Sequence, residues 1–166
     1  MQNILTTDRL YLRPFQVIDA LGLYQLNTRP EVLVHTGDVP FVDVAAARDF
    51  ILTYDHYEHY GYGRWAVLEQ ASGRFIGFCG LKYHPIKGDT DLGYRINYAY
   101  WGKGYATEAA RACLHYGLHD LAIARIIGRV RQANIASINV LEKIGMQREG
   151  TFDFEGFPGY LYVGMI

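Results

Sequence analysis

Two glycines separated by one residue lie directly before the most strongly periodic segment of the sequence. The segment from Trp101 to Ala106 reads Trp-Gly-Lys-Gly-Tyr-Ala, and a predicted helix follows it. Glycine removes the side chain where a ligand must approach the backbone. The first turn of a helix adds unpaired N–H groups and the positive end of the helix dipole. Together with the Lys103 ammonium, this arrangement predicts a site for phosphate or pyrophosphate.

Two familiar phosphate-binding patterns do not fit this loop. The P-loop requires Ser or Thr after its Gly-Lys pair, whereas Gly104 follows Lys103 here. The dinucleotide pattern requires a third glycine where this chain has Thr107, within a parallel βαβ unit. Because a lone Gly-x-Gly is also typical of an ordinary turn, the loop by itself leaves a purely structural role open.

Histidine spacing gives a weak signal for metal. His115 and His119 are one helical turn apart, but Tyr116 occupies the place of the glutamate in the His-Glu-x-x-His pattern. We therefore predict no metal site. His56 and His59 have acidic neighbours, and we predict that they lie on a solvated face.

The composition indicates a single globular domain over residues 1–166. Half of the residues are hydrophobic, which suffices for a substantial core. The formal net charge of -1 gives no sign of a nucleic-acid partner. An apolar run of about 18 residues, as a membrane span requires, is absent. Cys79 and Cys113 form neither a zinc pattern nor a disulfide framework, and no signal-like stretch opens the sequence, so we expect a cytoplasmic protein.

Hydrophobic spacing predicts a mixture of strands and helices. Strands are predicted over 9–15, 65–69, 75–83, 91–96, 125–131, 150–154 and 160–165, those between 65 and 96 forming an antiparallel meander. Helices are predicted after N-capping residues Asp19 and Asp43, and over 106–118 and 134–144. The strand, loop and helix between residues 91 and 118 are the centre of interest.

Four segments, taken in order, resemble the GNAT acetyltransferases, and most closely the branch of ribosomal-protein-alanine and spermidine N-acetyltransferases. The segments are Thr7 to Arg13, Asp91 to Tyr94, Trp101 to Ala109 and Asn134 to Met146. The resemblance implies a mixed α/β, α+β-like fold of the GNAT type, with a central, mostly antiparallel, splayed sheet flanked by helices.

The resemblance also implies acetyl-CoA as co-substrate. Its pantetheine arm is expected to pair with backbone groups of Tyr94, Arg95 and Ile96, and Asn134 corresponds to a family asparagine that contacts the cofactor. The pyrophosphate is expected on the N–H groups of the loop, whose residues are Trp101, Gly102, Lys103, Gly104, Tyr105 and Ala106.

Acetyl transfer to an amine sets chemical demands on the site. An alkylammonium, with a pKa of about 10, must lose a proton before it attacks, and the departing thiolate benefits from an acid. The resemblance places Asp91 where the family often has a glutamate base that acts through water; a solvated, turn-proximal aspartate is the alternative. Asp89 is a weaker candidate, and His84 either faces the acceptor cleft or is a plain loop histidine.

The acid departs from the family pattern. Leu141 stands where many members have a tyrosine, and it cannot donate a proton. The ribosomal-protein branch implies Ser137 instead, for which the alternative is a serine bonded to the helix backbone. Tyr94 and Tyr160 remain further candidates.

We therefore expect a monomeric or homodimeric N-acetyltransferase that acts on a protein N-terminus or a small-molecule amine, such as a polyamine or amino sugar. The acidic residues considered as attractors of a cationic amine are Asp38, Asp43, Asp91, Asp153 and Glu155. Leu141 and the shortened Asp91 motivate an alternative, a catalytically inactive acyl-CoA-binding sensor on the same fold. A structural domain without a CoA site is the third possibility.

Overall fold

One eight-stranded sheet carries the fold, which a computed structural model describes for residues 4–166. Residues 1–3 of the predicted domain lie outside the described residues. The order across the sheet is β1-β2-β3-β4-β5-β6-β8-β7. The strands are β1 (Leu5–Thr6), β2 (Leu10–Arg13), β3 (Arg64–Glu69), β4 (Phe75–His84), β5 (Asp89–Ile96), β6 (Arg125–Arg131), β7 (Gln147–Phe154) and β8 (Phe157–Met165).

The predicted meander is confirmed, because β3, β4 and β5 pair antiparallel in sequence order. β6 coincides with its predicted range, while β7 and β8 each begin three residues earlier than predicted. Their shared hairpin turns at residues 155–156, where Glu155 and Gly156 both have positive φ.

The sheet splays at its centre, as the resemblance implies. β5 and β6 run parallel, and their register contains only the pairs Thr90–Ile126 and Asp91–Ile127. From Leu92 to Ile96, β5 pairs with β4 alone. One backbone edge of β5 is therefore left without a strand partner beyond Asp91.

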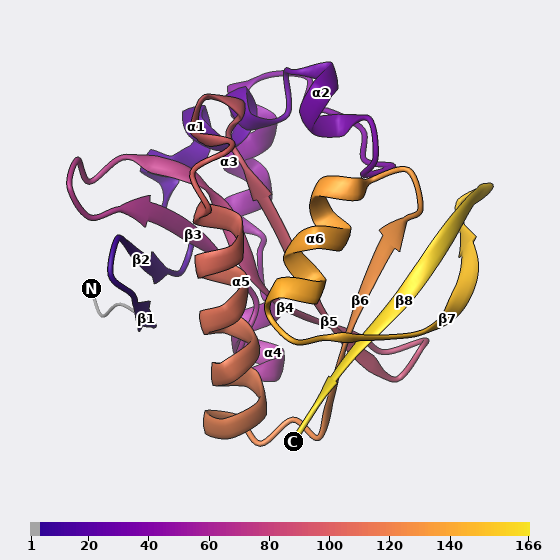
Figure 1. The fold of residues 1–166 in the computed structure, drawn as a ribbon. Coiled ribbons are helices and arrows are strands. Elements are labelled where there is room, and N and C mark those ends of the chain that lie inside the picture. Colours follow the sequence, from indigo (N-terminus) through magenta and orange to yellow (C-terminus); the bar gives the residue numbers. More distant parts are fainter. Residues whose placement is uncertain (1–3) are drawn as a thin grey trace.

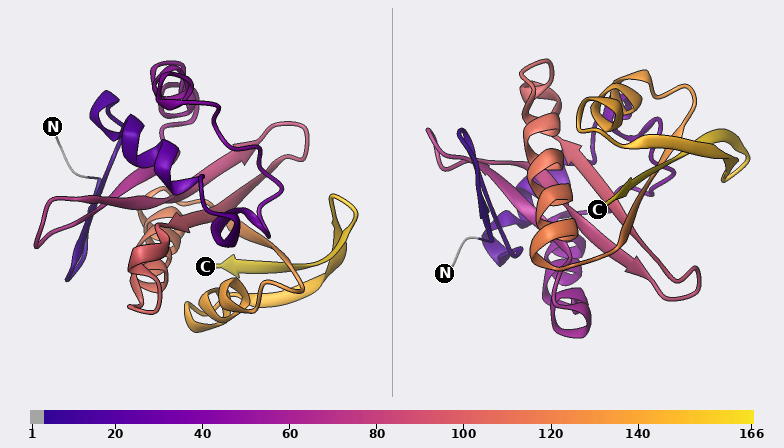
Figure 2. Two further views of the ribbon diagram at one scale, coloured as in Figure 1. Left: turned by 90° about the horizontal axis from the view of Figure 1, so that it is seen from above. Right: turned by 60° about the horizontal axis from the view of Figure 1, so that its bottom comes forward.

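Helices cover both faces of this sheet. They are α1 (Ala20–Leu26), α2 (Pro30–Leu33), α3 (Val44–Leu52), α4 (His56–Tyr60), α5 (Tyr105–His115) and α6 (Ile135–Lys143). α5 packs on β4 and β5 while α6 packs on β6, so these two helices stand beside each other (Figure 1). Seen from above, α1 and α3 lie on the opposite side of the sheet from α5 and α6 (Figure 2).

Small residues let α5 approach the sheet closely. Ala109, Ala110 and Cys113 are fully buried on its inner face. The predicted helix over 106–118 is corrected at its end, because the α-helix stops at His115 and continues as a π-helical turn to Asp120. Gly117 lies in this turn, and a β-carbon there would collide with side chains of the neighbouring strands.

Two predictions about polar residues need correction. His56 is buried rather than solvated, and its Nε2 accepts a hydrogen bond of 3.0 Å from the Tyr83 backbone N–H. Burial lowers the pKa of His56, which keeps that nitrogen available as an acceptor.

Asp19 does not cap α1, because its carboxylate forms a buried ion pair with Arg13 at 2.7 Å. Asp43 does cap α3, through the Ala46 N–H at 2.8 Å.

Candidate active site

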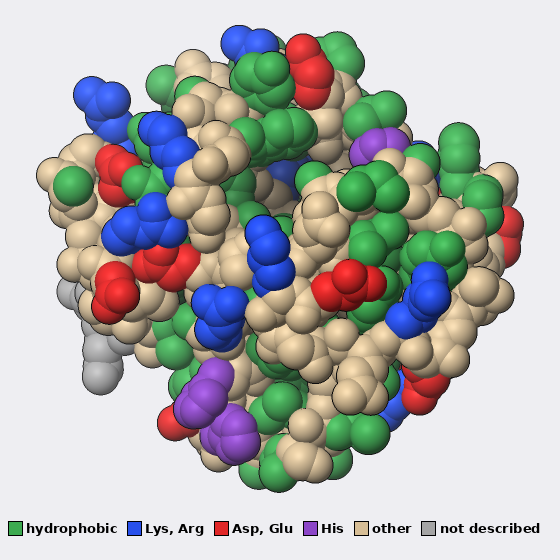
Figure 3. All heavy atoms as spheres, viewed as in Figure 1, with side chains coloured by type: hydrophobic (Ala, Val, Ile, Leu, Met, Phe, Trp, Pro, Cys, Tyr) green, Lys and Arg blue, Asp and Glu red, His purple; other side chains and the backbone are tan. Residues whose placement is uncertain are grey.

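A cavity of about 600 Å³ opens where β5 and β6 diverge. Most of its lining comes from β4, β5 and β6, from α6, and from the segment between residues 35 and 41, and Arg64 of β3 and side chains of α1 and α3 add to it. The surface is hollowed between the first turns of α5 and α6 (Figure 3). The separation of β5 and β6 therefore creates a cavity between the helices on one face of the sheet and those on the other face.

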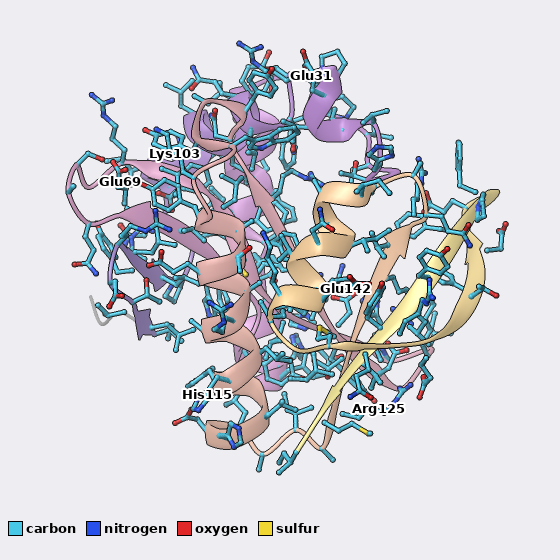
Figure 4. All side chains as sticks on the ribbon, in the orientation of Figure 1. Glu31, Glu69, Lys103, His115, Arg125 and Glu142 are labelled. Atoms are coloured by element: carbon cyan, nitrogen blue, oxygen red, sulfur yellow. The ribbon has the colours of Figure 1, made fainter. Side chains whose placement is uncertain are left out.

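The glycine loop presents an open backbone at the start of α5. Gly102 and Gly104 have φ of +74° and +78°, and Gly104 is the N-cap residue of the helix. A β-carbon at Gly102 would have no described atom within 4 Å, and one at Gly104 would approach only the Arg9 guanidinium, at 3.5 Å. Lys103 lies in this loop beside α5 (Figure 4). The loop has the exposed N–H groups and the cation that an anionic ligand requires.

A hydrogen-bond network anchors the loop to the N-terminal strands. The Glu108 carboxylate accepts bonds from the Thr7 hydroxyl at 2.6 Å and from the Arg9 side chain at 2.6 Å. Arg9 also donates to the Lys103 carbonyl at 2.8 Å. Partial burial raises the pKa of Glu108, but these donors outweigh it and hold the pKa below its ordinary value. The N-terminal segment thus fixes the loop in place.

The edge of β5 is only partly available to a ligand. Trp101 Nε1 donates to the Ile96 carbonyl at 2.7 Å, so this carbonyl already has one partner. The side chains of Tyr94 and Arg95 line the cavity, whereas Ile96 is buried and does not line it. Arg95 donates to Asn27 at 2.8 Å and to Asp38 at 2.5 Å.

Asn134 and Ser137 line the cavity from the start of α6. The Asn134 Oδ1 accepts the Ser137 N–H at 3.2 Å and so caps the helix. The Ser137 hydroxyl lies 2.7 Å from the Tyr94 hydroxyl, which also donates to the Ser137 carbonyl at 3.1 Å. Burial raises the pKa of Tyr94, so its hydroxyl keeps its proton. Two candidate acids thus form one hydrogen-bonded pair across the opening between β5 and α6.

The other residues considered for the acid lie elsewhere. Leu141 lines the cavity with a buried, apolar side chain that also contacts the β6 backbone beside Gly128. Tyr160 lies on β8 under the Arg148 guanidinium, 4.6 Å from it, and is not part of the described lining.

Asp91 lies at the point where β5 and β6 separate, and both of its carboxylate oxygens are engaged. Oδ1 accepts from Arg64 at 2.5 Å, and Oδ2 lies 2.7 Å from His84 Nε2 and 3.7 Å from Arg129. Burial by itself raises the pKa of Asp91, but the charges and hydrogen bonds of Arg64 and His84 outweigh burial and hold the pKa far below its ordinary range. The carboxylate is therefore ionised at neutral pH.

Arg64 was not predicted as a site residue; its guanidinium lies over Gly93 and bonds the Gly80 carbonyl. Gly80 and Gly93 are register partners in β4 and β5. A β-carbon at Gly93 would come within 2.3 Å of the Arg64 guanidinium, and Arg64 donates to the Gly80 carbonyl at 2.7 Å. The pair of glycines was a sequence signal for a side chain stacked on the sheet. Arg129, paired with Asp89 at 2.5 Å, was missed as well.

The cavity is more basic than acidic. Of the acidic residues considered for attracting an amine, only Asp38 and Asp91 line it, and both are paired with arginines. Asp43 caps α3, Asp153 accepts from the Gly156 N–H, and Glu155 lies 3.9 Å from Arg131. The basic lining residues are Arg64, Lys82, Lys87, Arg95 and Arg129.

Comparison with known proteins assigns this arrangement to a family. The family model described as an acetyltransferase (GNAT) domain matches residues 9–147. The chain belongs to the GNAT acetyltransferases. An uncharacterized N-acetyltransferase, p20, of Bacillus licheniformis is 34% identical over 160 residues, which cover 95% of this chain and 90% of that protein. It follows that the chain is an acetyl-CoA-dependent acyltransferase, and the resemblance found in the sequence is confirmed.

Solved GNAT structures share the fold. An acetyltransferase of the GNAT family from Bacillus anthracis superposes with a TM-score of 0.83 at 26% identity, covering 96% of each chain. A ribosomal alpha-N-protein acetyltransferase in complex with coenzyme A superposes with a TM-score of 0.82 at 19% identity, covering 99% of this chain and 98% of that one. The mixed α/β GNAT fold, with its mostly antiparallel splayed sheet, is thus established. Nothing in these comparisons supports the inactive sensor.

Residues 4–166 show neither a grouped set of metal ligands nor a membrane-spanning helix. That part of the chain contains no group of three or more His, Cys, Asp or Glu side chains arranged to hold a metal ion. The His115 and His119 rings lie 4.4 Å apart on the outer side of α5 and its π-helical turn. None of the helices in the described residues is long and apolar enough to cross a membrane.

Proposed function

We propose that this GNAT chain transfers an acetyl group from acetyl-CoA to a primary amine by direct attack in a ternary complex. The amine is a protein N-terminus or a small molecule. The observation that supports this proposal is the cavity between β5 and β6, which the Tyr94–Ser137 pair and Asp91 line together. We further propose a cytoplasmic monomer or homodimer, consistent with two free, buried cysteines.

The proposed cofactor contacts follow the open backbone. The pyrophosphate binds the N–H groups of residues 102–106, beside the Lys103 ammonium, because the Trp101 N–H already donates to the Tyr98 carbonyl at 3.1 Å. The pantetheine arm runs along the free edge of β5 from Tyr94. Asn134 lies at the start of α6 and lines the cavity together with Ser137, whose N–H its Oδ1 accepts. The residues present fit the group, because the open glycine loop with Lys103 begins α5 and the unpaired edge of β5 borders the cavity, although the loop itself is not part of the cavity lining.

The proposed reaction needs no covalent intermediate on the protein. Bound acetyl-CoA supplies an electrophilic thioester carbonyl. The ammonium gives up one proton, and the nitrogen lone pair then forms the new N–C bond. The C–S bond breaks with its electron pair on sulfur, which takes up a proton. The nitrogen loses its second proton, so the number of protons is conserved. The products are an amide, a free thiol and one proton that passes to solvent.

We propose that the Tyr94–Ser137 pair protonates the departing sulfur. Either hydroxyl can donate to the other, so a proton lost from Ser137 to the sulfur is replaced from Tyr94, and the second proton that leaves the nitrogen restores Tyr94. The pair thus acts as the acid in place of the family tyrosine, whose position Leu141 occupies. Holding the amine and the thioester in one cavity supplies much of the remaining acceleration.

Acetyl-CoA is expected to stabilise the folded protein. A ligand at about 100 times its dissociation constant stabilises by about 2.7 kcal/mol. For a chain of this length, the thermal midpoint rises by about 5–10 °C. A panel of primary amines, with detection of the free thiol, then tests turnover. A folded protein whose midpoint does not respond to acetyl-CoA would contradict the proposed cofactor site, and binding without thiol release from any amine would contradict the proposed transfer.

The basic lining predicts which amines react best. An amine that also carries a carboxylate, such as an amino acid or a short peptide, is expected to exceed spermidine in kcat/KM by at least about 10-fold at low salt. The reason is that Lys82 and Lys87, which make no ion pair within residues 4–166, lie at the cavity wall and repel a polycation. Added salt should reduce the difference.

Charge reversal provides the control for this preference. The variant K82E/K87E should reduce or invert the ratio of the two kcat/KM values, whereas K143E should leave it unchanged, because Lys143 is exposed at the end of α6, away from the cavity lining. A wild-type preference for spermidine would show that the basic residues do not select the acceptor.

A further inference from the structure

His84 has the geometry of a base positioned by a carboxylate. It is the last residue of β4, lines the cavity, and has a side chain that is 28% exposed. Its Nε2 lies 2.7 Å from Asp91 Oδ2. Its Nδ1 makes no hydrogen bond within residues 4–166, and so one ring nitrogen is held by the protein while the other stays available.

Asp91 is poorly suited to take the proton itself. Both of its oxygens already accept hydrogen bonds, from Arg64 and His84. A carboxylate whose pKa lies far below its ordinary range holds a proton weakly, and an effective general base has a pKa near the working pH. The same carboxylate is well suited to orient an imidazole and to stabilise its charged form.

We infer that His84 Nδ1 accepts the proton from the acceptor ammonium and that Asp91 positions His84. The carboxylate at Nε2 selects the tautomer with the proton on Nε2, which leaves the Nδ1 lone pair for the substrate. Arg64 in turn fixes Asp91 by bonding its other oxygen at 2.5 Å. This inference rests on the proposed acetyl transfer and names the residue that starts it.

The proton transfer is balanced within the site. The ammonium N–H bond breaks, its electron pair stays on nitrogen, and the proton moves to Nδ1 to form an imidazolium. Asp91 supplies the negative charge that stabilises this cation, 2.7 Å from the other nitrogen. His84 then releases the proton to solvent, to which its side chain is partly exposed. His84 is unchanged after each turnover.

Other charged groups surround the pair and set the pH response. Lys82 precedes His84 on the same face of β4, and Lys87 follows it in the turn. Asp89 is the register partner of His84 in β5 and holds Arg129 of β6 at 2.5 Å. From α4, His56 is close enough for its charge to be coupled to that of His84. The cations oppose the imidazolium, and the aspartates favour it.

The experiment compares H84Q with the wild type in thiol release, using the best amine of the panel. Loss of the base is expected to lower kcat/KM by about 100-fold at pH 7. The pH profile of the wild type should rise through an acid limb and level off. The residual activity of H84Q should instead keep rising with pH, because the amine must then ionise without help from the protein.

Two further variants separate a catalytic from a structural role. H59Q is the matched control, because His59 is exposed on α4 and outside the cavity lining; its profile should match that of the wild type. D91N should lower kcat more than it changes KM for the amine, since the imidazole loses the carboxylate that orients it. H84Q and D91N should both keep the stabilisation by acetyl-CoA, which shows that they are folded and bind the cofactor.

Failure of this inference differs from failure of the proposed function. Wild-type turnover that survives within about 3-fold in H84Q, with the acid limb unchanged, overturns the role of His84 and leaves the transfer in place. A wild type that binds acetyl-CoA but releases no thiol with any amine overturns both. An acid limb that D91N removes and H84Q retains would make Asp91 itself the base.

Discussion

Replacing Gly104 by glutamate is expected to weaken the binding of acetyl-CoA by about 100-fold. Gly104 is the N-cap residue of α5, with a φ of +78° and almost no neighbouring atoms around the position of a β-carbon. A glutamate there places a carboxylate where the pyrophosphate is proposed to bind. At a separation of about 5 Å and an effective dielectric constant of about 20, the repulsion is about 3 kcal/mol. That corresponds to a loss of affinity of about 100-fold.

The measurement is the thermal midpoint of G104E across a titration of acetyl-CoA, with isothermal calorimetry as a second readout. At about 100 times the wild-type dissociation constant, the midpoint shift should fall from about 5–10 °C to about 1 °C, because the variant then gains only about 0.4 kcal/mol. G61E is the matched control, because Gly61 has a φ of +76°, has no described atom within 4 Å of a β-carbon, and lies after α4. Both variants carry similar backbone strain, so only the position differs. Binding by G104E with wild-type affinity would place the pyrophosphate elsewhere.

Helix-forming and strand-forming patterns predicted most elements of the fold, because these patterns depend on the local spacing of residues. Buried residues about one turn apart, such as Ala109 and Cys113, defined α5, and a short run rich in β-branched residues defined β6. The end of α5 was not predictable, because Gly117 adopts a π-helical turn to fit against β4 and β6, and those contacts are remote in sequence. The burial of His56 has the same cause, since its partner is the Tyr83 backbone.

The residues of the candidate site show the same contrast between signals local in sequence and contacts between distant segments. The glycine loop was found because its whole signal is contiguous, from Trp101 to the first turn of α5. The neighbours of Asp91 were not found, because Arg64, His84 and Arg129 come from three different strands and meet only when the sheet forms. Local sequence identified Asp91 and could not show that its oxygens are already occupied.

Arg64 bonds directly to Asp91 in the cluster that His84 and Arg129 complete, and replacing Arg64 is expected to reduce both stability and activity. Arg64 and Asp91 have side chains that are 17% and 14% exposed, and Arg64 also bonds the Gly80 carbonyl. Replacement by methionine keeps much of the length and removes the charge. Leaving a buried charge without its partner costs about 3–5 kcal/mol. We expect the lower end, about 3 kcal/mol, because His84 still contacts Asp91. The thermal midpoint should fall by about 6–12 °C.

The pH dependence of this loss identifies its source. The pKa of Asp91 is lower in the folded protein than in the unfolded chain, so the stabilisation by Arg64 is fully present above the unfolded pKa of about 3.9. It is lost as the pH falls below that value and the carboxylate takes up a proton. Unfolding of wild type and R64M in urea should therefore show the full difference at pH 7 and a shrinking one below about pH 4.

A double-mutant cycle separates the fold from the chemistry at this position. Adding D91N to R64M removes the unpaired charge and should recover part of the lost stability. It should not recover turnover, because no carboxylate then orients His84, which Asp91 contacts at 2.7 Å in the wild type. Stability that does not recover would locate the cost in the Arg64 contacts with Gly80. Turnover that recovers with the stability would mean that the cluster acts only through folding, since an apolar methionine and a neutral amide can hold the sheet together but cannot hold an imidazolium.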